Sequence, residues 1–367
     1  MINVFFDHQK FSTQTFGGIS RYFATIIEEI KKNDNIDYVL GVLFSNNYYL
    51  KDSSKPLFNF IANKLLKSEY GKRTEIINEL YCKYLLSKNE FDVFHPTYYD
   101  TYFISKLKKP LVITVHDMTH EKLPEYFWAQ SPLTHNKRRN IEKADKIIAI
   151  SESTKNDLLE LTNIDEKKID VVYHGIDNNT PLVFEMIPNL PDQYILFVGD
   201  RSGYKNFYTF IDAFVLVSAL YPTINIILCG GGALGIADLE IISQRKLVGK
   251  VKHLQVNDYE LNYLYRNALV FVYPSLYEGF GLPILEAYKA NCPIILSDID
   301  CFKEVAGNAA LYFSKHEKED LASKIISVIE NNQTRTNLID LGSERIKLFP
   351  LDTSMQKTLD IYRYLAQ

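Results

Sequence analysis

The sequence predicts an α/β protein built from two doubly wound, Rossmann-like domains with parallel sheets. Strand-like runs alternate with helix-like runs along the chain, as expected when helical crossovers connect parallel strands. A proline-containing stretch near the middle interrupts this alternation once. A length of 367 residues also exceeds what one hydrophobic core usually accommodates, which favours two domains of about 150–200 residues each.

The expected strands form two series, one in each half of the chain. In the first half they are residues 2–6, 38–44, 93–95, 111–115, 146–150 and 169–173. In the second half they are residues 194–198, 224–229, 251–254, 269–273, 293–296 and 310–313. Each run is short and mainly apolar and lies next to a helical pattern, which is typical of strands buried on both faces.

The stretch 178–191 contains several prolines and has no clear period, which predicts a linker. We therefore expect an N-terminal domain over residues 1–180 and a C-terminal domain over residues 181–351. The last segment, 352–367, has an apolar stripe at helical spacing and should pack against another part of the chain. The stripe consists of Met355, Leu359, Tyr362 and Ala366.

Composition and charge exclude several classes of protein. With 46% hydrophobic and 23% charged residues the composition is that of an ordinary globular protein, and a net charge of −4 argues against a nucleic-acid binder. No long apolar run is present, and Asp7 interrupts the apolar N-terminus too early for a signal peptide, so we expect a cytoplasmic protein. The cysteines lack paired spacing, which favours reduced thiols over disulfides or a zinc site.

The segment 60–88 carries an excess of lysine and arginine, interleaved with isoleucine, leucine and tyrosine at helical spacing. Such a helix could lie on the anionic cytoplasmic face of the inner membrane as a peripheral contact. The alternative is a solvated helix whose apolar side packs on its own domain.

The most informative stretch is 274–287. A buried strand-like run precedes it, and Pro283 suits the first position of a helix, where a missing N–H costs nothing. Glycines let the backbone approach a ligand closely, and the free N–H groups at the helix start favour a phosphate. The sequence therefore predicts a phosphate-binding loop. Its residues are Gly279, Phe280, Gly281 and Leu282.

Two carboxylates flank this loop. Glu278 precedes it, and Glu286 lies about one turn into the helix. The Glu286 carboxylate can accept two hydrogen bonds from a vicinal diol such as a ribose, while Glu278 can meet a second polar group of the same ligand. A nucleotide diphosphate sugar offers all these features. The alternative is that both acids merely complement the dipole of a helix N-terminus.

The segment from Glu278 to Glu286 resembles the Glu-x7-Glu signature of retaining glycosyltransferases with the GT-B fold, specifically family 4. The resemblance implies two Rossmann-like domains that face an interdomain cleft, an N-terminal acceptor-binding domain and a C-terminal nucleotide-sugar donor-binding domain. It also implies that the last helix crosses back to the first domain and that the chemistry requires no metal or other cofactor.

Arg201 and Lys205 lie on a glycine-containing loop after the first strand of the second half. Cations there can neutralise a diphosphate and stabilise a leaving group. Members of the resembled family place an arginine where this chain has Asp200, so Arg201 is the expected substitute, and Lys205 keeps its family position. A solvated loop would explain either side chain alone equally well.

The first half contributes His116, which follows the strand 111–115 and resembles the family histidine that touches the donor sugar. His120 lies four residues later, which invites a metal interpretation. We predict no metal site, because no third ligand stands at a recognisable spacing. Gly17 and Gly18 match the family's glycine pair opposite the donor phosphates, although a tight strand-to-helix turn would explain them as well.

Three further patterns are weaker. Val256 and Asn257 occupy the segment that lines the base pocket in members of the family, and are expected to contact the nucleotide base. The glycines of 230–235 fit a dinucleotide-binding pattern but lack its later acid, so a shaped turn is favoured over a nicotinamide or flavin site. Asp298 and Asp300 spell Asp-x-Asp, which holds a divalent metal in other glycosyltransferases, but the resemblance implies metal-independent chemistry.

Together these features predict a retaining hexosyltransferase that moves a mannose-like hexose from a UDP- or GDP-sugar to a saccharide hydroxyl. The resemblance implies a lipid-linked acceptor in the synthesis of O-antigen, capsule or exopolysaccharide. The expected catalytic residues are His116, Glu278, Lys205 and Arg201. The alternatives are a catalytically silent sugar-nucleotide-binding partner subunit and another GT-B activity, such as a phosphorylase or an epimerase.

Overall fold

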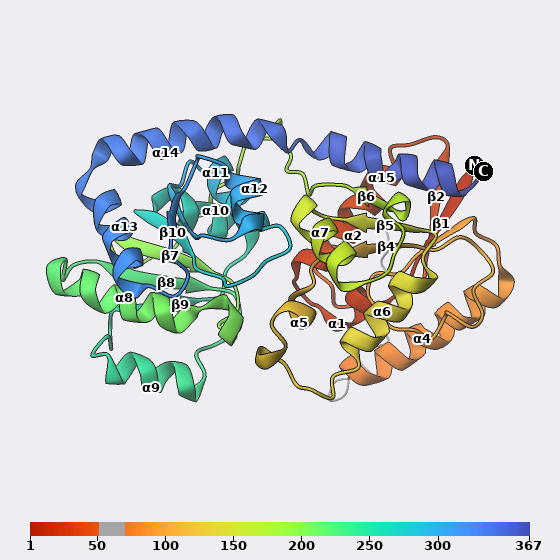
Figure 1. Ribbon diagram of the computed structural model, residues 1–367, viewed down its shortest axis with the longest axis horizontal. Helices are drawn as coiled ribbons and strands as arrows, with labels where there is room; N and C mark the ends of the chain where they lie inside the picture. Colours follow the sequence, from red (N-terminus) through yellow and green to blue (C-terminus); the bar gives the residue numbers. More distant parts are fainter. Residues whose placement is uncertain (51–69) are drawn as a thin grey trace. The chain divides into compact units, whose positions relative to one another are not determined.

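The computed structural model describes residues 1–50 and 70–367 of the chain (Figure 1). The chain divides into two compact units. The first unit consists of Met1–Glu121, Trp128–Tyr173 and Asp352–Gln367, and the second of Lys122–Phe127 and His174–Leu351. Within the described residues, no helix combines the length and apolar character needed to span a membrane.

The division after Tyr173 falls before the boundary expected at residue 180, and the segment Lys122–Phe127 joins the second unit. Aromatic packing explains this placement. Phe127 lies 5.6 Å from the ring of Tyr204, and the ring of Tyr126 sits against Gly203 so closely that a side chain there would collide with it. No periodic pattern in residues 122–127 indicates that this segment joins the second unit.

The first unit contains parallel strands in two sheets, with the orders β2-β1-β3 and β4-β5-β6. A parallel bridge between Phe94 and Leu111 joins them at β3 and β4. The strands are β1 (Ile2–Phe6), β2 (Ile36–Leu40), β3 (Val93–His95), β4 (Val112–Val115), β5 (Lys146–Ala149) and β6 (Ile169–Val171). The α-helices are α1 (Gln9–Thr13), α2 (Gly18–Ile30), α4 (Tyr70–Lys88), α5 (Thr119–Lys122), α6 (Leu133–Lys143), α7 (Glu152–Leu161) and α15 (Leu351–Leu365).

The strand expected over 38–44 begins and ends earlier, as β2. The backbone N–H groups of Leu43 and Phe44 donate to the side-chain oxygen of Asn78, at 2.8 and 3.0 Å, instead of to a neighbouring strand. Asn78 lies on α4 and is fully buried. A buried amide has therefore taken over the hydrogen bonds that would have extended the strand.

Helix α15 packs on the first unit, although it comes last in the sequence. Met355, Leu359 and Tyr362 of its apolar stripe are buried. The ring nitrogen Nδ1 of His95 lies 2.7 Å from the Tyr362 hydroxyl, and its Nε2 lies 3.0 Å from Oγ1 of Thr114. A buried hydrogen-bonded chain thus fixes the last helix to β3 and β4, where the two sheets of the first unit meet.

The second unit holds one six-stranded parallel sheet of order β12-β11-β10-β7-β8-β9. Its strands are β7 (Tyr194–Val198), β8 (Asn225–Cys229), β9 (Val251–Leu254), β10 (Val270–Tyr273), β11 (Ile294–Ser297) and β12 (Leu311–Phe313). Its helices are α8 (Phe207–Leu220), α9 (Ile236–Gln244), α10 (Asp258–Asn267), α11 (Leu282–Lys289), α12 (Asp300–Ala306), α13 (Lys318–Glu330) and α14 (Asn332–Arg345). These strands, helices and register confirm the predicted α/β class.

The chain order in this sheet reverses between β7 and β10, which are neighbours in the sheet but far apart in sequence. In open α/β sheets, ligands bind at the carboxyl ends of strands beside such a reversal. The loops that follow β7 and β10 carry the residues singled out from the sequence. The fold therefore brings Arg201, Lys205, Glu278 and Glu286 to one end of the second sheet.

Candidate functional site

The centre of the candidate site is an ion pair between the two loops. Nζ of Lys205 lies 2.5 Å from Oε1 of Glu278. Lys205 ends a short 3-10 turn, and Asn206, in the left-handed conformation, then starts α8. The two side chains are only 12% and 14% exposed, so the contact is shielded from water. The structure thus brings together two of the predicted catalytic residues.

Aromatic rings surround the Lys205 ammonium, which lies 5.0 Å from the centre of the Tyr204 ring and 5.6 Å from that of Tyr273. Burial lowers the pKa of Lys205, but the Glu278 carboxylate outweighs it and holds this pKa well above its usual value. Burial and the same carboxylate raise the pKa of Tyr273. The lysine is therefore a fixed cation, suited to binding an anion.

Contacts with residues outside the loop hold the loop after β10 in place. The Phe280 ring packs against His174 at 5.4 Å and Phe349 at 5.7 Å, and the Cys301 thiol donates to the Phe280 carbonyl at 3.2 Å. Gly281 has a φ of +100°, and a Cβ there would lie 3.0 Å from Ile284, so only glycine fits comfortably. Phe280 therefore anchors the loop in the core, while Gly281 shapes its backbone.

Helix α11 begins at Leu282, so Pro283 is its second residue and not, as predicted, its first. Glu286 follows on this helix and is partly buried. The hydroxyl of the buried Tyr265 donates to Oε2 of Glu286 at 3.4 Å, which is a long hydrogen bond. The N-terminus of α11 and this carboxylate thus belong to the same helix, as a diphosphate and a ribose would require.

Arg201 has a local structural role that the sequence did not reveal. Its Nε donates to Oδ2 of Asp238 at 2.9 Å, and its terminal nitrogens donate to consecutive backbone carbonyls of the loop after β8. Those acceptors are Gly230 at 3.2 Å, Gly231 at 3.3 Å, Gly232 at 2.9 Å and Ala233 at 2.8 Å. The guanidinium therefore holds this loop by hydrogen bonds, which leaves fewer of its N–H groups for contact with a diphosphate.

The glycines in that loop confirm the prediction of a shaped turn. Gly230, Gly231 and Gly232 all have positive φ, between +68° and +83°. A Cβ at Gly231 would lie 2.6 Å from the Cα of Asp200 and 3.1 Å from the Arg201 guanidinium. The loop after β8 and the loop after β7 are therefore packed together, with Arg201 between them.

Asn257 caps helix α10. Its side-chain oxygen accepts from the backbone N–H groups of Tyr259 at 2.8 Å and Glu260 at 3.0 Å, and its amide donates to Glu185 at 3.0 Å. These bonds give the residue a structural function, so its predicted contact with a nucleotide base stays a prediction. Val256 beside it is partly buried.

In the first unit, Gly17 is the N-cap of α2, and Gly18 is its first residue. The side-chain oxygen of Gln14 accepts from the backbone N–H of Ser20 at 3.2 Å and so caps the helix. A Cβ on Gly17 would lie 2.5 Å from this glutamine side chain, whereas one on Gly18 would meet no atom within 4 Å. Gly17 is thus explained by the cap, and Gly18 is not explained by packing.

His116 follows β4 and is buried. Its ring contacts Tyr22 at 5.6 Å and Phe23 at 6.3 Å, both edge to face, and its backbone N–H donates to the Tyr99 hydroxyl at 3.1 Å. Burial is the main cause of a lowered pKa for His120. In the described residues no group of three or more histidine, cysteine, aspartate or glutamate side chains is arranged to hold a metal ion.

Sequence reasoning did not single out the buried carboxylate of Asp7, directly after β1. It accepts from the backbone N–H and the hydroxyl of Thr97, both at 2.8 Å, from Nε2 of Gln9 at 2.7 Å and from the Tyr102 hydroxyl at 3.1 Å. An acid at the end of an apolar strand was the available signal. These bonds tie the carboxyl ends of β1 and β3 together.

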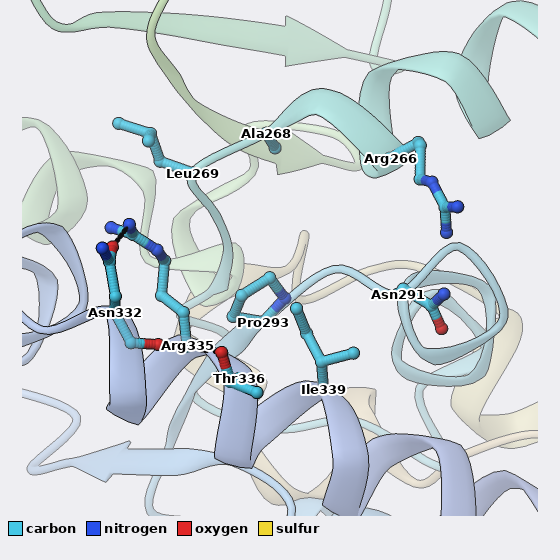
Figure 2. Close-up of a pocket in the computed structure, with 9 residues that line it drawn as sticks. All are labelled: Arg266, Ala268, Leu269, Asn291, Pro293, Asn332, Arg335, Thr336 and Ile339. Atoms are coloured by element: carbon cyan, nitrogen blue, oxygen red, sulfur yellow. Dashed lines mark hydrogen bonds between the residues drawn. The ribbon is translucent and has the colours of Figure 1, made fainter.

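A cavity of about 480 Å³ lies at the other end of the second sheet (Figure 2). Leu269 and Pro293, which line it, precede β10 and β11 and so mark the amino ends of these strands. Arg335, also in its lining, donates to the carbonyls of Val328 at 2.8 Å and Ile329 at 3.0 Å and to Asn332. The Arg335 guanidinium is thus engaged at the end of α13, and none of the predicted residues lines the cavity. We therefore do not assign the donor site there.

Two α/β units, each built on parallel strands, are the architecture of the GT-B glycosyltransferases. The shielded pair of Lys205 and Glu278 lies at the strand ends of the second unit. The chain belongs to this class by sequence as well. Residues 16–180 match the family described as Glycosyltransferase Family 4, and residues 184–345 match Glycosyl transferases group 1. The family resemblance inferred from the Glu-x7-Glu segment is therefore confirmed.

Curated relatives include O-antigen chain mannosyltransferase RfbU of Salmonella typhimurium, which is 30% identical over 62% of this chain and 63% of its own length. O-antigen chain mannosyltransferase B of Escherichia coli is 25% identical over 69% of this chain and 70% of its own length. The aligned region thus spans under two thirds of the first of these relatives.

Solved structures confirm the GT-B fold. Anabaena Alr3699/HepE in complex with UDP superposes with a TM-score of 0.69 at 18% identity, covering 100% of both chains. Sucrose-phosphate synthase from Thermosynechococcus elongatus superposes with a TM-score of 0.74 at 17% identity, covering 100% of this chain and 99% of the other. At these identities the likeness concerns the fold alone.

Proposed function

We propose that the protein is a retaining hexosyltransferase that transfers mannose or a related hexose from a nucleotide diphosphate sugar to a saccharide hydroxyl. The observation that carries this proposal is the shielded pair of Lys205 and Glu278 beside the N-terminus of α11, with Glu286 on the same helix. The names of the curated relatives, which are mannosyltransferases of O-antigen chains, support mannose as the transferred sugar.

In this proposal the second unit binds the donor. The diphosphate would lie against the Lys205 ammonium and the N-terminus of α11, the ribose diol on Glu286, and a sugar hydroxyl on Glu278. Fixed cations and dipoles in a shielded site stabilise developing negative charge without reorganising during the reaction. Arg201 would serve the donor indirectly, because its guanidinium is engaged by the loop after β8.

The reaction would break the bond between the anomeric carbon and the phosphate oxygen and form a bond from the same carbon to the acceptor oxygen. The electrons of the broken bond leave with the phosphate, which takes the acceptor's proton. Attack on the side that the phosphate leaves gives retention. No enzyme base is then required, and the roles of His116, Gly17 and Gly18 towards the donor stay predictions.

The test is a thermal-shift panel of UDP, GDP and their hexose conjugates, followed by turnover with the nucleotide that binds. A ligand at 100 times its Kd should stabilise the folded protein by about 2.7 kcal/mol. Binding without transfer to any saccharide would contradict the enzyme and favour a silent sugar-nucleotide-binding subunit. Metal independence is tested in the same assay, since EDTA should leave turnover unchanged.

We propose further that the acceptor is lipid-linked and that α4 contacts the membrane that carries it. Ile76, Leu80 and Tyr84 recur every fourth residue along α4 and are 60%, 60% and 54% exposed. Residues separated by four positions share one face of a helix, so these side chains form an apolar stripe. Lys72, Arg73 and Lys88 add positive charge on the same helix, whereas the earlier part of the basic segment lies outside the described residues.

Flotation with vesicles tests this contact. The protein should float with vesicles rich in anionic phosphatidylglycerol and much less with neutral phosphatidylcholine. The double variant Ile76→Ser/Leu80→Ser should lose this binding, while Ile236→Ser/Leu239→Ser on α9, where the side chains are 79% and 53% exposed, should retain it. Equal flotation of both double variants would exclude α4 as the contact.

A further inference from the structure

The Lys10 side chain lies at the carboxyl end of β1 in the first unit. Lys10 lies on α1, directly after β1, and is partly buried. Its ammonium nitrogen lies 3.4 Å from the centre of the Tyr98 ring. Within residues 1–50 and 70–367, the ring is the sole contact found for this nitrogen, since neither a hydrogen bond nor an ion pair reaches it. A partly desolvated cation therefore stands without an anion.

The backbone around this cation is tightly fixed. The N–H of Lys10 donates to Oγ1 of Thr97 at 3.1 Å, and the same hydroxyl lies 2.8 Å from the Asp7 carboxylate. The side-chain oxygen of Gln9 accepts from the backbone N–H of Asp100 at 2.8 Å. Hydrogen bonds therefore hold the segment that carries Lys10 against the segment that carries Tyr98.

Nearby charges do not satisfy the cation. Burial lowers the pKa of Lys10 to about 8, and the Asp117 carboxylate opposes this shift only in part. Asp117 is itself buried, which raises its pKa, but Lys137 and the hydrogen bonds of Thr119 together lower this pKa below its usual value. Nζ of Lys137 donates to the Asp117 carbonyl at 3.1 Å and to Glu121 at 2.8 Å. Asp117 and Glu121 are thus already engaged by Lys137.

We propose that Lys10, supported by Tyr98, is the anion-binding group of an acceptor subsite in the first unit, and that the acceptor is an acidic saccharide carrying a phosphate or a carboxylate. This inference rests on the proposed glycosyl transfer. An ammonium is a compact cation with three hydrogen-bond donors, which suits the clustered oxygens of a phosphate or carboxylate. Neutral sugar hydroxyls would supply dipoles but no charge.

Binding of small acceptor analogues to the full chain tests the proposal. The probes are a hexose 1-phosphate, a methyl glucuronide and the neutral methyl hexoside, titrated calorimetrically near pH 7 with UDP or GDP at saturation to occupy the donor site. The proteins are wild type, Lys10→Gln, Lys10→Arg and the control Lys108→Gln, which removes an exposed lysine of the same unit. Circular dichroism checks that each variant is folded.

At least one acidic probe should bind more tightly than the neutral one, and Lys10→Gln should weaken that probe by about ten-fold or more while leaving the neutral probe unchanged. Lys10→Arg should retain most of the preference, and Lys108→Gln all of it. The phosphate and glucuronide arms show which anion is preferred. Equal binding of acidic and neutral probes, or an unchanged preference in folded Lys10→Gln, overturns the proposal.

Failure of the proposed function has a different signature. If neither UDP nor GDP binds any variant, the proposed donor site is wrong. The acidic and neutral probes, titrated into wild type and Lys10→Gln, still show whether Lys10 binds an anion. Conversely, normal nucleotide binding with no effect at Lys10 rejects the subsite and leaves the donor site in place.

Discussion

Lys205 donates a 2.5 Å hydrogen bond to Glu278, and this contact joins the loop after β7 to the loop after β10. Both loops end on helices whose first residues lie at the carboxyl edge of the second sheet. The pair therefore does two things at once. It balances a buried cation, and it fixes the distance between two loops that would hold one diphosphate.

Lys205→Ala should lower kcat/KM for the sugar nucleotide by about ten-fold or more, because a cation preorganised for the leaving phosphate is lost. Initial rates at varied donor concentration measure this effect. The control Lys318→Ala removes an exposed lysine of the same unit and should change nothing. Unaltered donor kinetics in Lys205→Ala would remove this residue from the site.

Glu278→Gln should lower the free energy of unfolding as well as the transferase activity. With both side chains mostly shielded, loss of the carboxylate leaves the Lys205 ammonium buried without a partner, which costs on the order of 3 kcal/mol. Urea unfolding of Glu278→Gln, Lys205→Met and the double variant measures this. The double variant should be more stable than Glu278→Gln alone, and strict additivity of the two changes would show that the residues do not interact.

Glu286→Ala should raise the donor KM and abolish discrimination between a ribonucleotide and its 2′,3′-dideoxy analogue, because the proposed partner of Glu286 is the ribose diol. Competition by the two diphosphates against the donor measures the discrimination. Tyr265→Phe removes only a 3.4 Å hydrogen bond to Glu286 and should have a small effect. Glu240→Ala, an exposed acid on α9, serves as the control. A discrimination that survives Glu286→Ala places the ribose elsewhere.

Arg201→Lys and Asp238→Asn should weaken nucleotide binding to a similar extent, and the double variant should be no worse than either. The physical reason is that both residues act on one loop, with Arg201 holding its carbonyls and Asp238 holding Arg201. Calorimetric titration of the diphosphate measures this. Arg245→Lys, which alters a more exposed pair with Asp212, is the matched control. A loss confined to Arg201→Lys would instead indicate direct contact with the phosphates.

Parts of this site follow from sequence because strand ends are predictable. A buried apolar run followed by glycines and a helix placed Glu278 and Glu286, and the run ending at Val198 placed Lys205, so their common edge of the sheet was expected. The ion pair itself was not, since residues 73 apart meet only through the β7–β10 pairing. Such pairing depends on tertiary packing, for which a single sequence has no periodic signal.

The same limit explains what was missed. Three of the four carbonyl acceptors of Arg201 belong to glycines in the left-handed region. No pattern in the sequence indicates which side chain will bind such a turn. Lys10 was not singled out, because a lysine near a strand end is usually solvated. Its environment depends on Thr97 and Tyr98, which follow a different strand, β3.

The free energy of unfolding should fall in mild acid because of two buried histidines. Burial lowers the pKa of His95 to about 3 and that of His174 to about 4, whereas an unfolded chain binds the proton near pH 6.5. Since the unfolded state then binds more protons, the stabilisation is complete above about pH 6.5 and is lost as the pH falls towards these values. At pH 5 each histidine should account for a loss of about 2 kcal/mol.

Urea unfolding at pH 7.5 and at pH 5 tests this assignment through the difference between the two values, so that any constant cost of a substitution cancels. In His95→Gln the difference should shrink by about 2 kcal/mol, because the amide can still bond Tyr362 and Thr114 but does not titrate. His135→Gln removes an exposed histidine and should leave the difference as in wild type. If His95→Gln loses as much stability between pH 7.5 and pH 5 as the wild type, another group causes that loss. The buried link between α15 and the first unit's strands is then not the origin of the acid sensitivity.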